Sequence, residues 1–275
     1  MRRRARGPGG LIVTGVAGAL LVLVQPAAKA ATAGSSPARP ARPALPAHQA
    51  KNHSTVESTN WSGYVDRAPA GGHITSVIGH WVVPSAQSLP PGFSAAWTGI
   101  GGFGTTDLIQ AGTTTNSLGG AQYYAWFELL PDAETPIAAC SRDASCTVNP
   151  GDSIAVHIDS TGGEGWRIRI DDQGHWSWSA NVTYRSTQST AEWVLESPSV
   201  GAGPTMLANV GAVTFDDGNG YRADGLTRLV GQGDPIPIRL NTLGLLPVSE
   251  PSAIDADGDG FRVCSYGATC APPNP

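Results

Sequence analysis

The sequence predicts an all-β protein, an antiparallel sandwich or barrel, from two patterns. Apolar and polar residues alternate with a period of two in several segments, as in half-buried strands, whereas helical spacing is almost absent. The runs are short and are separated by turn residues, and the chain contains 35 Gly and 22 Pro. Many short strands with Gly- and Pro-rich turns are typical of antiparallel sandwiches and barrels.

The clearest alternation lies in the middle of the chain. Residues 153–159, 166–171 and 175–185 each place isoleucine, valine or tryptophan on one face and polar residues on the other. The segment Asp171–Gly174 between the last two runs is typical of a hairpin turn. We therefore expect consecutive antiparallel strands here.

The N-terminal residues predict an exported protein. Residues 1–30 have a basic start, an apolar stretch Leu11–Val24 and a small-residue cleavage site Ala28–Ala30, as in secretory signals. The apolar stretch is shorter than the roughly 20 residues of a membrane span. Residues 31–53, rich in Pro, Ala and Arg, are expected to be a disordered linker or pro-segment. Residues 54–275 would then form one secreted β domain.

The charge balance excludes some partners. Residues 1–30 hold five of the 17 basic residues and no acid, so the remainder has 12 basic and 22 acidic residues, a net charge of −10. Nucleic acids and anionic membranes both require basic patches. We expect neither as a partner after signal cleavage, and we expect a monomer.

Four cysteines in an exported chain predict two disulfides, for which three pairings are possible. The equal, short separations favour Cys140–Cys146 and Cys264–Cys270. No CxxC motif is present and no histidine is near either pair, so neither a metal site nor a cofactor is expected.

A second candidate metal segment is Asp255–Gly260, which matches the first half of a calcium loop. Counted from Asp255, position 12 is Tyr266, where such a loop needs a bidentate glutamate. A tight acidic turn is therefore the favoured interpretation.

Three polar residues interrupt apolar strands. Gln110 lies in an apolar run, Glu128 shares a face with Tyr124 and Trp126, and Glu192 shares a strand face with Val194 and Glu196. A buried amide must find hydrogen-bond partners, and a carboxylate on an aromatic face is typical of a groove lining. A strand-edge cap, an ion pair with arginine and a solvated charge are the respective structural alternatives.

Several segments, taken in order, resemble the glutamic peptidases, or eqolisins. This family consists of secreted acid proteases that pepstatin does not inhibit. The resemblance covers Ser58–Val263, nearly the whole expected domain. The matching segments are Ser58–Val65, His80–Pro84, Ala95–Gly102, Leu108–Thr113, Tyr123–Asp132, Gly151–Ile158 and Thr190–Pro198, with Asn209–Phe215 downstream.

The resemblance implies a sandwich of two large antiparallel sheets with a concave substrate groove, concanavalin- or jelly-roll-like in architecture. It also implies a catalytic dyad that falls on Gln110 and Glu192, with Trp97 and Glu128 nearby. Tyr124 and Trp126 accompany Glu128 as expected substrate-binding residues. Glu196, on the same face as Glu192, is expected to be an ordinary strand-end charge.

The implied chemistry is peptide hydrolysis by water. Glu192 would take the proton of water and return it to the leaving nitrogen, and an ordinary glutamate, with a pKa near 4.3, can do both in acid. The Gln110 amide would donate to the developing oxyanion. Two alternatives stay open: a glycoside hydrolase that uses Glu128 and Glu192 as its carboxyl pair, and a non-catalytic carbohydrate-binding sandwich.

Overall fold

The computed structural model describes residues 53–140, 145–200, 203–242, 246–266 and 270–275. Nearly all regular structure in these ranges is β-strand, which confirms the predicted class. The expected signal segment and nearly all of the expected linker lie outside the described residues. In the ranges that are described, no helix has the length and apolar character needed to cross a membrane.

The strands follow one another along the whole described chain, with a single short 3-10 turn, Val230–Gln232. Their bounds are β1 Val56–Ser58, β2 Trp61–Arg67, β3 Ile74–Val82, β4 Ala95–Gly101, β5 Leu108–Asn116, β6 Gln122–Leu129, β7 Thr135–Pro136, β8 Ser153–Gly162, β9 Gly165–Asp172, β10 Trp176–Thr183, β11 Thr190–Glu196, β12 Ser199–Val200, β13 Gly203–Pro204, β14 Ala212–Phe215, β15 Gly220–Ala223, β16 Leu226–Leu229, β17 Ile236–Thr242, β18 Leu246–Pro251 and β19 Phe261–Ser265.

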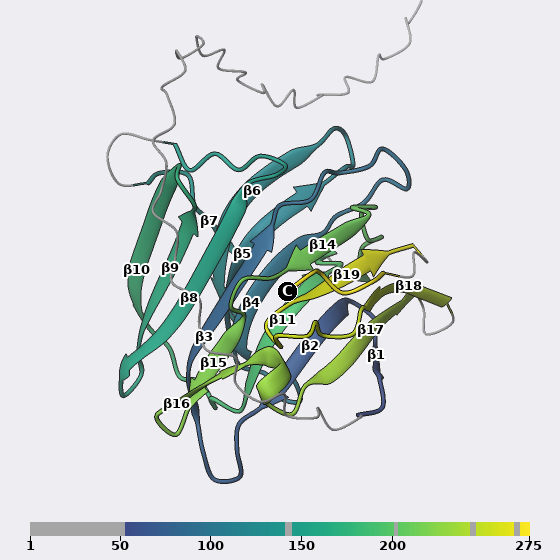
Figure 1. The fold of residues 1–275 in the computed structure, drawn as a ribbon. Coiled ribbons are helices and arrows are strands. Elements are labelled where there is room, and N and C mark those ends of the chain that lie inside the picture. Colours follow the sequence, from purple (N-terminus) through teal and green to yellow (C-terminus); the bar gives the residue numbers. More distant parts are fainter. Residues whose placement is uncertain (1–52, 141–144, 201–202, 243–245, 267–269) are drawn as a thin grey trace, which may run out of the picture. The chain divides into compact units, whose positions relative to one another are not determined.

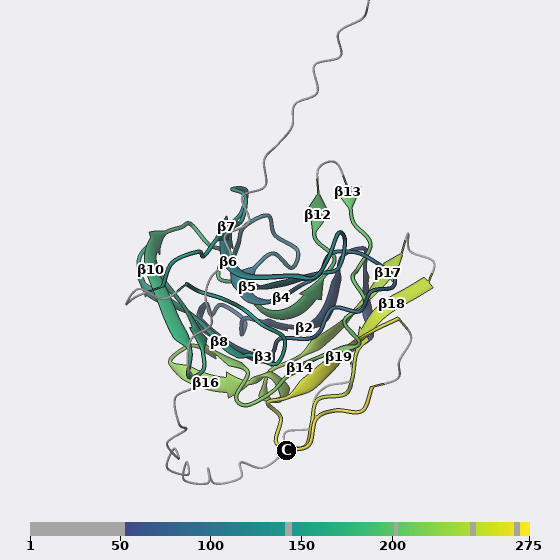
Figure 2. The same cartoon turned by 90° about the horizontal axis from the view of Figure 1, so that it is seen from above.

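Two layers of strands form the sandwich (Figures 1 and 2). One layer runs β17–β2–β11–β4–β5–β6–β7, and every neighbouring pair in it is antiparallel. The other runs β10–β9–β8–β3 and continues through β14 and β15. Strands β18 and β19 connect the layers, so 17 strands form one hydrogen-bonded network, with β12–β13 as a separate pair. The predicted hairpin joins β9 to β10.

The main apolar core lies between the layers, and buried tryptophans connect them. Trp193 of β11 is fully buried, and its indole Nε1 donates to the Ile78 carbonyl of β3 at 2.8 Å. Trp81 of β3 donates in the same way to the Thr113 hydroxyl of β5 at 3.0 Å. Each indole therefore fills core volume and satisfies a polar atom of the opposite layer.

A second apolar cluster covers the outer face of the first layer. Its buried members are Ala95, Trp97, Leu108, Trp126 and Val194. Because both faces of β4 and β5 are covered, every residue of these two strands is buried. Polar side chains on these strands therefore lie in a largely dry environment, and this outer face carries the candidate site.

The two disulfides join Cys140 to Cys146 and Cys264 to Cys270, with Cα–Cα distances of 5.4 and 6.0 Å. The pairing favoured by the short separations is confirmed. Both distances lie within the range that disulfide geometry allows.

We predict that Trp193→Ala lowers the free energy of unfolding by about 3–5 kcal/mol, because it removes a fully buried indole and leaves the Ile78 carbonyl without its donor. Urea unfolding followed by far-UV circular dichroism measures the change. Leu118→Ala, at a side chain that is 52% exposed, is the control and should stay within about 0.5 kcal/mol of wild type. Equal losses in both variants would contradict the assignment of Trp193 to the inter-layer core.

Candidate active site

A cavity of about 600 Å³ opens on the outer face of β4, β5, β6 and β11. Its floor includes side chains from these strands, and its rim includes residues just before β7 and at the start of β12. The polar and aromatic lining residues are Asn60, Trp61, Phe93, Gln110, Thr114, Asn116, Tyr124, Trp126, Glu128, Glu134, Glu196 and Ser199. The expected groove is therefore present, and it contains two strand carboxyl groups and two buried amides, those of Gln110 and Asn116.

Gln110 and Glu128 form the most direct polar contact in the cavity. They are opposite each other on β5 and β6, and Gln110 Nε2 donates to Glu128 Oε2 at 2.5 Å. Gln110 is 3% exposed, and its Oε1 has no hydrogen-bond partner. Burial raises the pKa of Glu128, and the charge of Glu134 raises it further, against the opposing effect of the Gln110 hydrogen bond. This contact fixes the amide and leaves its second N–H free to bind a substrate oxygen.

Glu196, the last residue of β11, is the second carboxyl group that lines the cavity. The Trp97 indole Nε1 donates to its Oε2 at 2.7 Å, and Asn60 Nδ2 donates to its Oε1 at 3.1 Å. Trp97 packs edge-to-face on Trp61, with ring centroids 5.0 Å apart. Both carboxyl oxygens are thus held by donors on elements far apart in the sequence.

The pKa of Glu196 is raised to about 7, chiefly by burial. The negative charge of Glu128 raises it as well. Hydrogen bonds from Trp97, Trp61 and Asn60 favour the anion and oppose this rise. A carboxyl group that exchanges its proton near neutrality suits general acid–base work.

Glu192 is placed differently from the expectation. It lies in one cross-strand row with Gln110, with Gly99 of β4 between them, but it is 0% exposed and is not among the residues that line the cavity. Phe103, in the loop after β4, brings its backbone near the carboxyl group, and Thr190 brings its hydroxyl, yet neither carboxyl oxygen has a well-formed hydrogen bond. The structure therefore brings Gln110 together with Glu196 in the cavity, and leaves Glu192 sealed from substrate.

The absence of solvent around Glu192 has a clear electrostatic effect. Burial raises its pKa well above the ordinary glutamate value, and the charge of Asp107 adds to the rise. A buried carboxylate without partners is strongly disfavoured, so the group keeps its proton instead. Asp66 on β2 behaves in the same way: it is 0% exposed, and burial raises its pKa well above the usual range.

The expected substrate-binding residues fall into two groups. Tyr124, Trp126 and Glu128 all line the cavity. The indole Nε1 of Trp126 is buried without a partner, so it is a donor that a bound ligand can satisfy. Trp97 is 0% exposed and contacts the cavity lining through its hydrogen bond to Glu196 and its packing on Trp61. It is a positioning residue for that carboxyl group.

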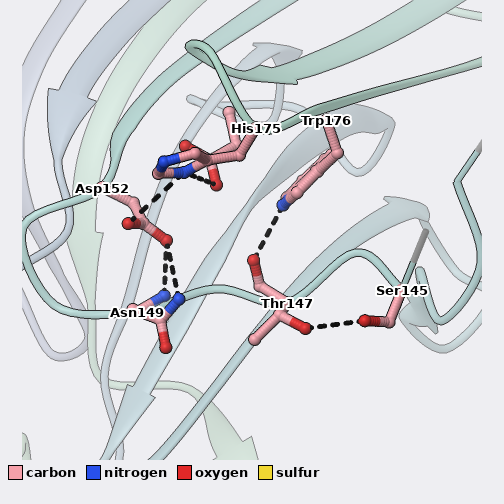
Figure 3. A network of polar contacts seen from close by, with 7 residues as sticks. Ser145, Thr147, Asn149, Asp152, His175 and Trp176 are labelled. Atoms are coloured by element: carbon pink, nitrogen blue, oxygen red, sulfur yellow. Dashed lines mark hydrogen bonds and ion pairs between the residues drawn. The ribbon is translucent and has the colours of Figure 1, made fainter. Parts of the chain in front are cut away.

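Another polar network, around His175, is separate from the cavity lining (Figure 3). The His175 ring Nδ1 lies 3.0 Å from Asp172 Oδ2 and 3.8 Å from Asp152 Oδ1. Asn149 donates to Asp152 from its backbone N–H at 2.6 Å. The side chains of Asp152, Asp172 and His175 are of types that bind metal ions. The imidazole, however, already lies against both carboxyl groups, as a structural histidine would.

With this geometry established, comparison with known proteins identifies the family. The sequence model of the peptidase A4 family matches residues 59–244. The chain belongs to the peptidase A4 family. This confirms the resemblance to glutamic peptidases. Aspergillopepsin-2 of Aspergillus niger is 27% identical in an alignment of 185 residues, and the match covers 58% of this chain and 62% of that protein. The chain thus spans less than two thirds of the length of this relative.

Solved structures of glutamic peptidases share the fold. Scytalido-glutamic peptidase with a transition state analog inhibitor superposes with a TM-score of 0.60 at 18% identity, covering 76% of this chain and 98% of that one. SCP-B, a member of the eqolisin family in complex with the tripeptide Ala-Ile-His, gives a TM-score of 0.58 at 18% identity and the same coverage. The two-layer β-sandwich is thereby confirmed.

Sequence reasoning missed Glu196 and Asn60 as site residues. The alternation does place Glu196 on the same face as Glu192, and the strand pairing puts it level with Ala95 of β4, beside the row that contains Trp97. A search for a carboxyl group within reach of an indole N–H would have favoured it. Asn60 has no such signal, because it meets Glu196 only through the pairing of β2 with β11.

We predict that the protein is most stable in acid. Native Glu192 and Glu196 keep protons that the unfolded chain loses near pH 4.3, so the native state binds more protons from there up to their raised pKa values. The free energy of unfolding is therefore highest below about pH 4 and falls as pH rises from there to about 7. The titration of Glu196 alone contributes about 3 kcal/mol to this fall. Thermal unfolding between these pH values measures the fall.

Glu192→Gln tests the cause of this fall. The amide is neutral at every pH, so the variant should lose less stability than wild type between about pH 4 and about pH 7. Glu164→Gln, at an exposed position of the β8–β9 hairpin, is the matched control and should follow the wild-type curve. A Glu192→Gln curve parallel to wild type would show that Glu192 does not titrate as its burial requires.

Proposed function

We propose that the protein is an endopeptidase that hydrolyses peptide bonds with Glu196 and Gln110, and not with Glu192. The observation that carries this proposal is the shared cavity: Gln110 and Glu196 both line it, whereas Glu192 is 0% exposed. Membership of the peptidase A4 family supports the reaction class. A glutamic peptidase of the same fold that was solved with a peptide-based transition state analog supports a polypeptide substrate.

In the proposed reaction, one carboxyl group moves a proton in both directions. Glu196 takes a proton from water as the water oxygen attacks the scissile carbonyl, and then gives a proton to the leaving nitrogen. The free N–H of Gln110 donates to the oxyanion that develops on the carbonyl oxygen. The amide cannot titrate, so this donor is present at any pH.

Glu128 holds the amide in place. Its hydrogen bond orients Gln110 Nε2, and its charge raises the pKa of Glu196. Removing the carboxylate is therefore expected to loosen the oxyanion donor and to lower the pKa of Glu196 together. Tyr124 and Trp126 provide the aromatic wall against which substrate side chains pack.

We further propose that the enzyme is secreted and works on the acid side of neutrality. Two disulfides suit an oxidising compartment, and the proton-holding carboxyl groups favour the folded state in acid. Pepstatin insensitivity is part of the same proposal, because the site combines an amide with a carboxyl group, whereas aspartic proteases share a proton between two aspartates.

The glycosidase alternative finds no support in the site. It needs Glu128 and Glu192 to flank one scissile bond, and Glu192 does not reach the cavity.

The proposal predicts which substitutions abolish peptide hydrolysis. Glu196→Gln should lower kcat by about 1,000-fold or more, and Gln110→Ala by about 100- to 1,000-fold, because each removes a group that acts in the transition state. Glu192→Gln and the exposed control Glu164→Gln should keep activity close to wild type. Cleavage of an unfolded protein substrate in the presence of pepstatin is the assay, with circular dichroism as the check on folding. Loss of activity in Glu192→Gln but not in Glu196→Gln would refute the assignment.

Trp97→Phe tests the tuning of Glu196. Loss of the indole donor raises the pKa of Glu196, so the limb of the pH profile of kcat/KM that Glu196 controls should move to higher pH. A rising limb indicates that the carboxylate acts first as a base, and a falling limb that the neutral acid acts first. A profile that keeps its wild-type pKa would contradict the positioning role of Trp97.

A further inference from the structure

Three aspartates from two separate segments meet at the start of β19. Asp216 follows the last residue of β14, while Asp255 and Asp259 lie in the turn that precedes β19. One carboxyl oxygen from each lies within 4.8 Å of the others. The turn is the half calcium loop seen in the sequence, and Asp216 comes from a part of the chain that the motif does not include.

Asp255 has one carboxyl oxygen engaged and one without a partner. Its Oδ1 accepts the backbone N–H groups of Gly258, Asp259 and Gly260 at 3.0, 3.2 and 3.1 Å. Its Oδ2 is buried and has no hydrogen-bond partner, and the residue is only 9% exposed. An unsatisfied buried carboxyl oxygen is costly unless a ligand satisfies it.

This free oxygen points to the same place as Asp216. A Cβ atom built on Gly260 would lie 2.2 Å from Asp255 Oδ2 and 2.6 Å from Asp216 Oδ1. The two oxygens therefore converge over the Gly260 backbone from different segments. Only glycine leaves this space open. Gly260 is also the sixth position of the loop, where calcium loops have an invariant glycine.

The cluster has no protein cation seated in it. Among the described residues, no ion pair joins a lysine, arginine or histidine to these three carboxyl groups; Arg262 acts on Asp216 only through its field. The network around His175 differs in this respect, because an imidazole lies against both of its aspartates. The converging carboxyl oxygens of the β19 turn lack such a counter-charge.

We propose that Asp216, Asp255 and Asp259 bind a calcium ion. Calcium prefers hard oxygen ligands in a flexible arrangement, and carboxylates are the main protein source of them. Asp257, at the third position of the loop, lies close enough to Asp255 to act on its carboxyl group. Asp216 supplies from another segment the carboxylate that the loop lacks where Tyr266 occupies position 12.

A calcium ion here would tie two connections of the second layer together. The turn after β14 already touches the β19 turn, where Asn219 Nδ2 donates to the Asp259 carbonyl at 3.0 Å. Asn219 Oδ1 in turn accepts the His80 N–H of β3 at 2.8 Å. The ion would therefore stabilise the ends of β14 and β19 against β3. This role does not depend on peptidase activity.

The test is a calcium titration of the purified full domain after removal of bound metal with EDTA, at about pH 7. Thermal unfolding with CaCl2 from about 10 µM to 10 mM covers the affinities of extracellular calcium modules. We expect Tm to rise by about 3–6 °C at 10 times the Kd, and equilibrium dialysis to give one ion per chain. MgCl2 at the same concentrations should give a smaller shift, because magnesium requires tighter octahedral geometry.

Variants assign the effect to this site. Asp216→Asn, at the partly exposed ligand, should reduce the calcium-dependent rise in Tm and weaken binding, and Asp255→Asn should abolish both. Asp152→Asn, in the His175 network, is the matched control and should keep the wild-type response. No rise in Tm and no bound ion in the wild-type protein would overturn the proposal. An unchanged response in Asp216→Asn would overturn it too, even if Asp255→Asn failed to fold.

Discussion

Strand β11 has both faces covered, and this constraint governs the chemistry of the whole protein. It pairs with β2 on one side and β4 on the other, and all its residues except the last are buried. One face packs into the main core through Trp193, and the other lies under the loop after β4 and beside the cavity. Any carboxyl group on this strand must therefore be neutral, held by donors, or both.

The two glutamates of β11 show two solutions to this constraint. Glu192 is sealed and keeps its proton because it has no well-formed hydrogen bond. Glu196, four residues later, reaches the cavity, where indole and amide donors hold both of its oxygens. Burial also raises the pKa of Glu196, to about 7. An acid environment thus favours the folded state, because ionising buried carboxyl groups is costly, whereas the proposed first step needs Glu196 as the carboxylate.

The aspartates at the start of β19 present the same problem of buried charge with another proposed solution. Asp255 gives one oxygen to three backbone N–H groups and keeps the other free. A divalent cation stabilises such oxygens as ions, whereas a proton neutralises them. The structure therefore contains buried carboxyl groups that hold protons and a cluster suited to a cation, and they lie in separate parts of the sandwich.

The sequence by itself determined the fold class, the family and the disulfide pairing. Alternation, turn residues and short cysteine spacings are local signals, and the ordered segments from Ser58 to Val263 predicted the family that the comparison confirmed. It also placed Gln110, Glu128, Tyr124 and Trp126 on the surface that became the cavity lining. Only the tertiary structure distinguished the accessibility of Glu192 from that of Glu196, because alternation gives them the same face. Their accessibility depends on a loop that covers one, and on Trp97 and Asn60, which meet the other from distant strands. Asp216 reaches the β19 turn in the same way, through contacts between segments that no local pattern encodes.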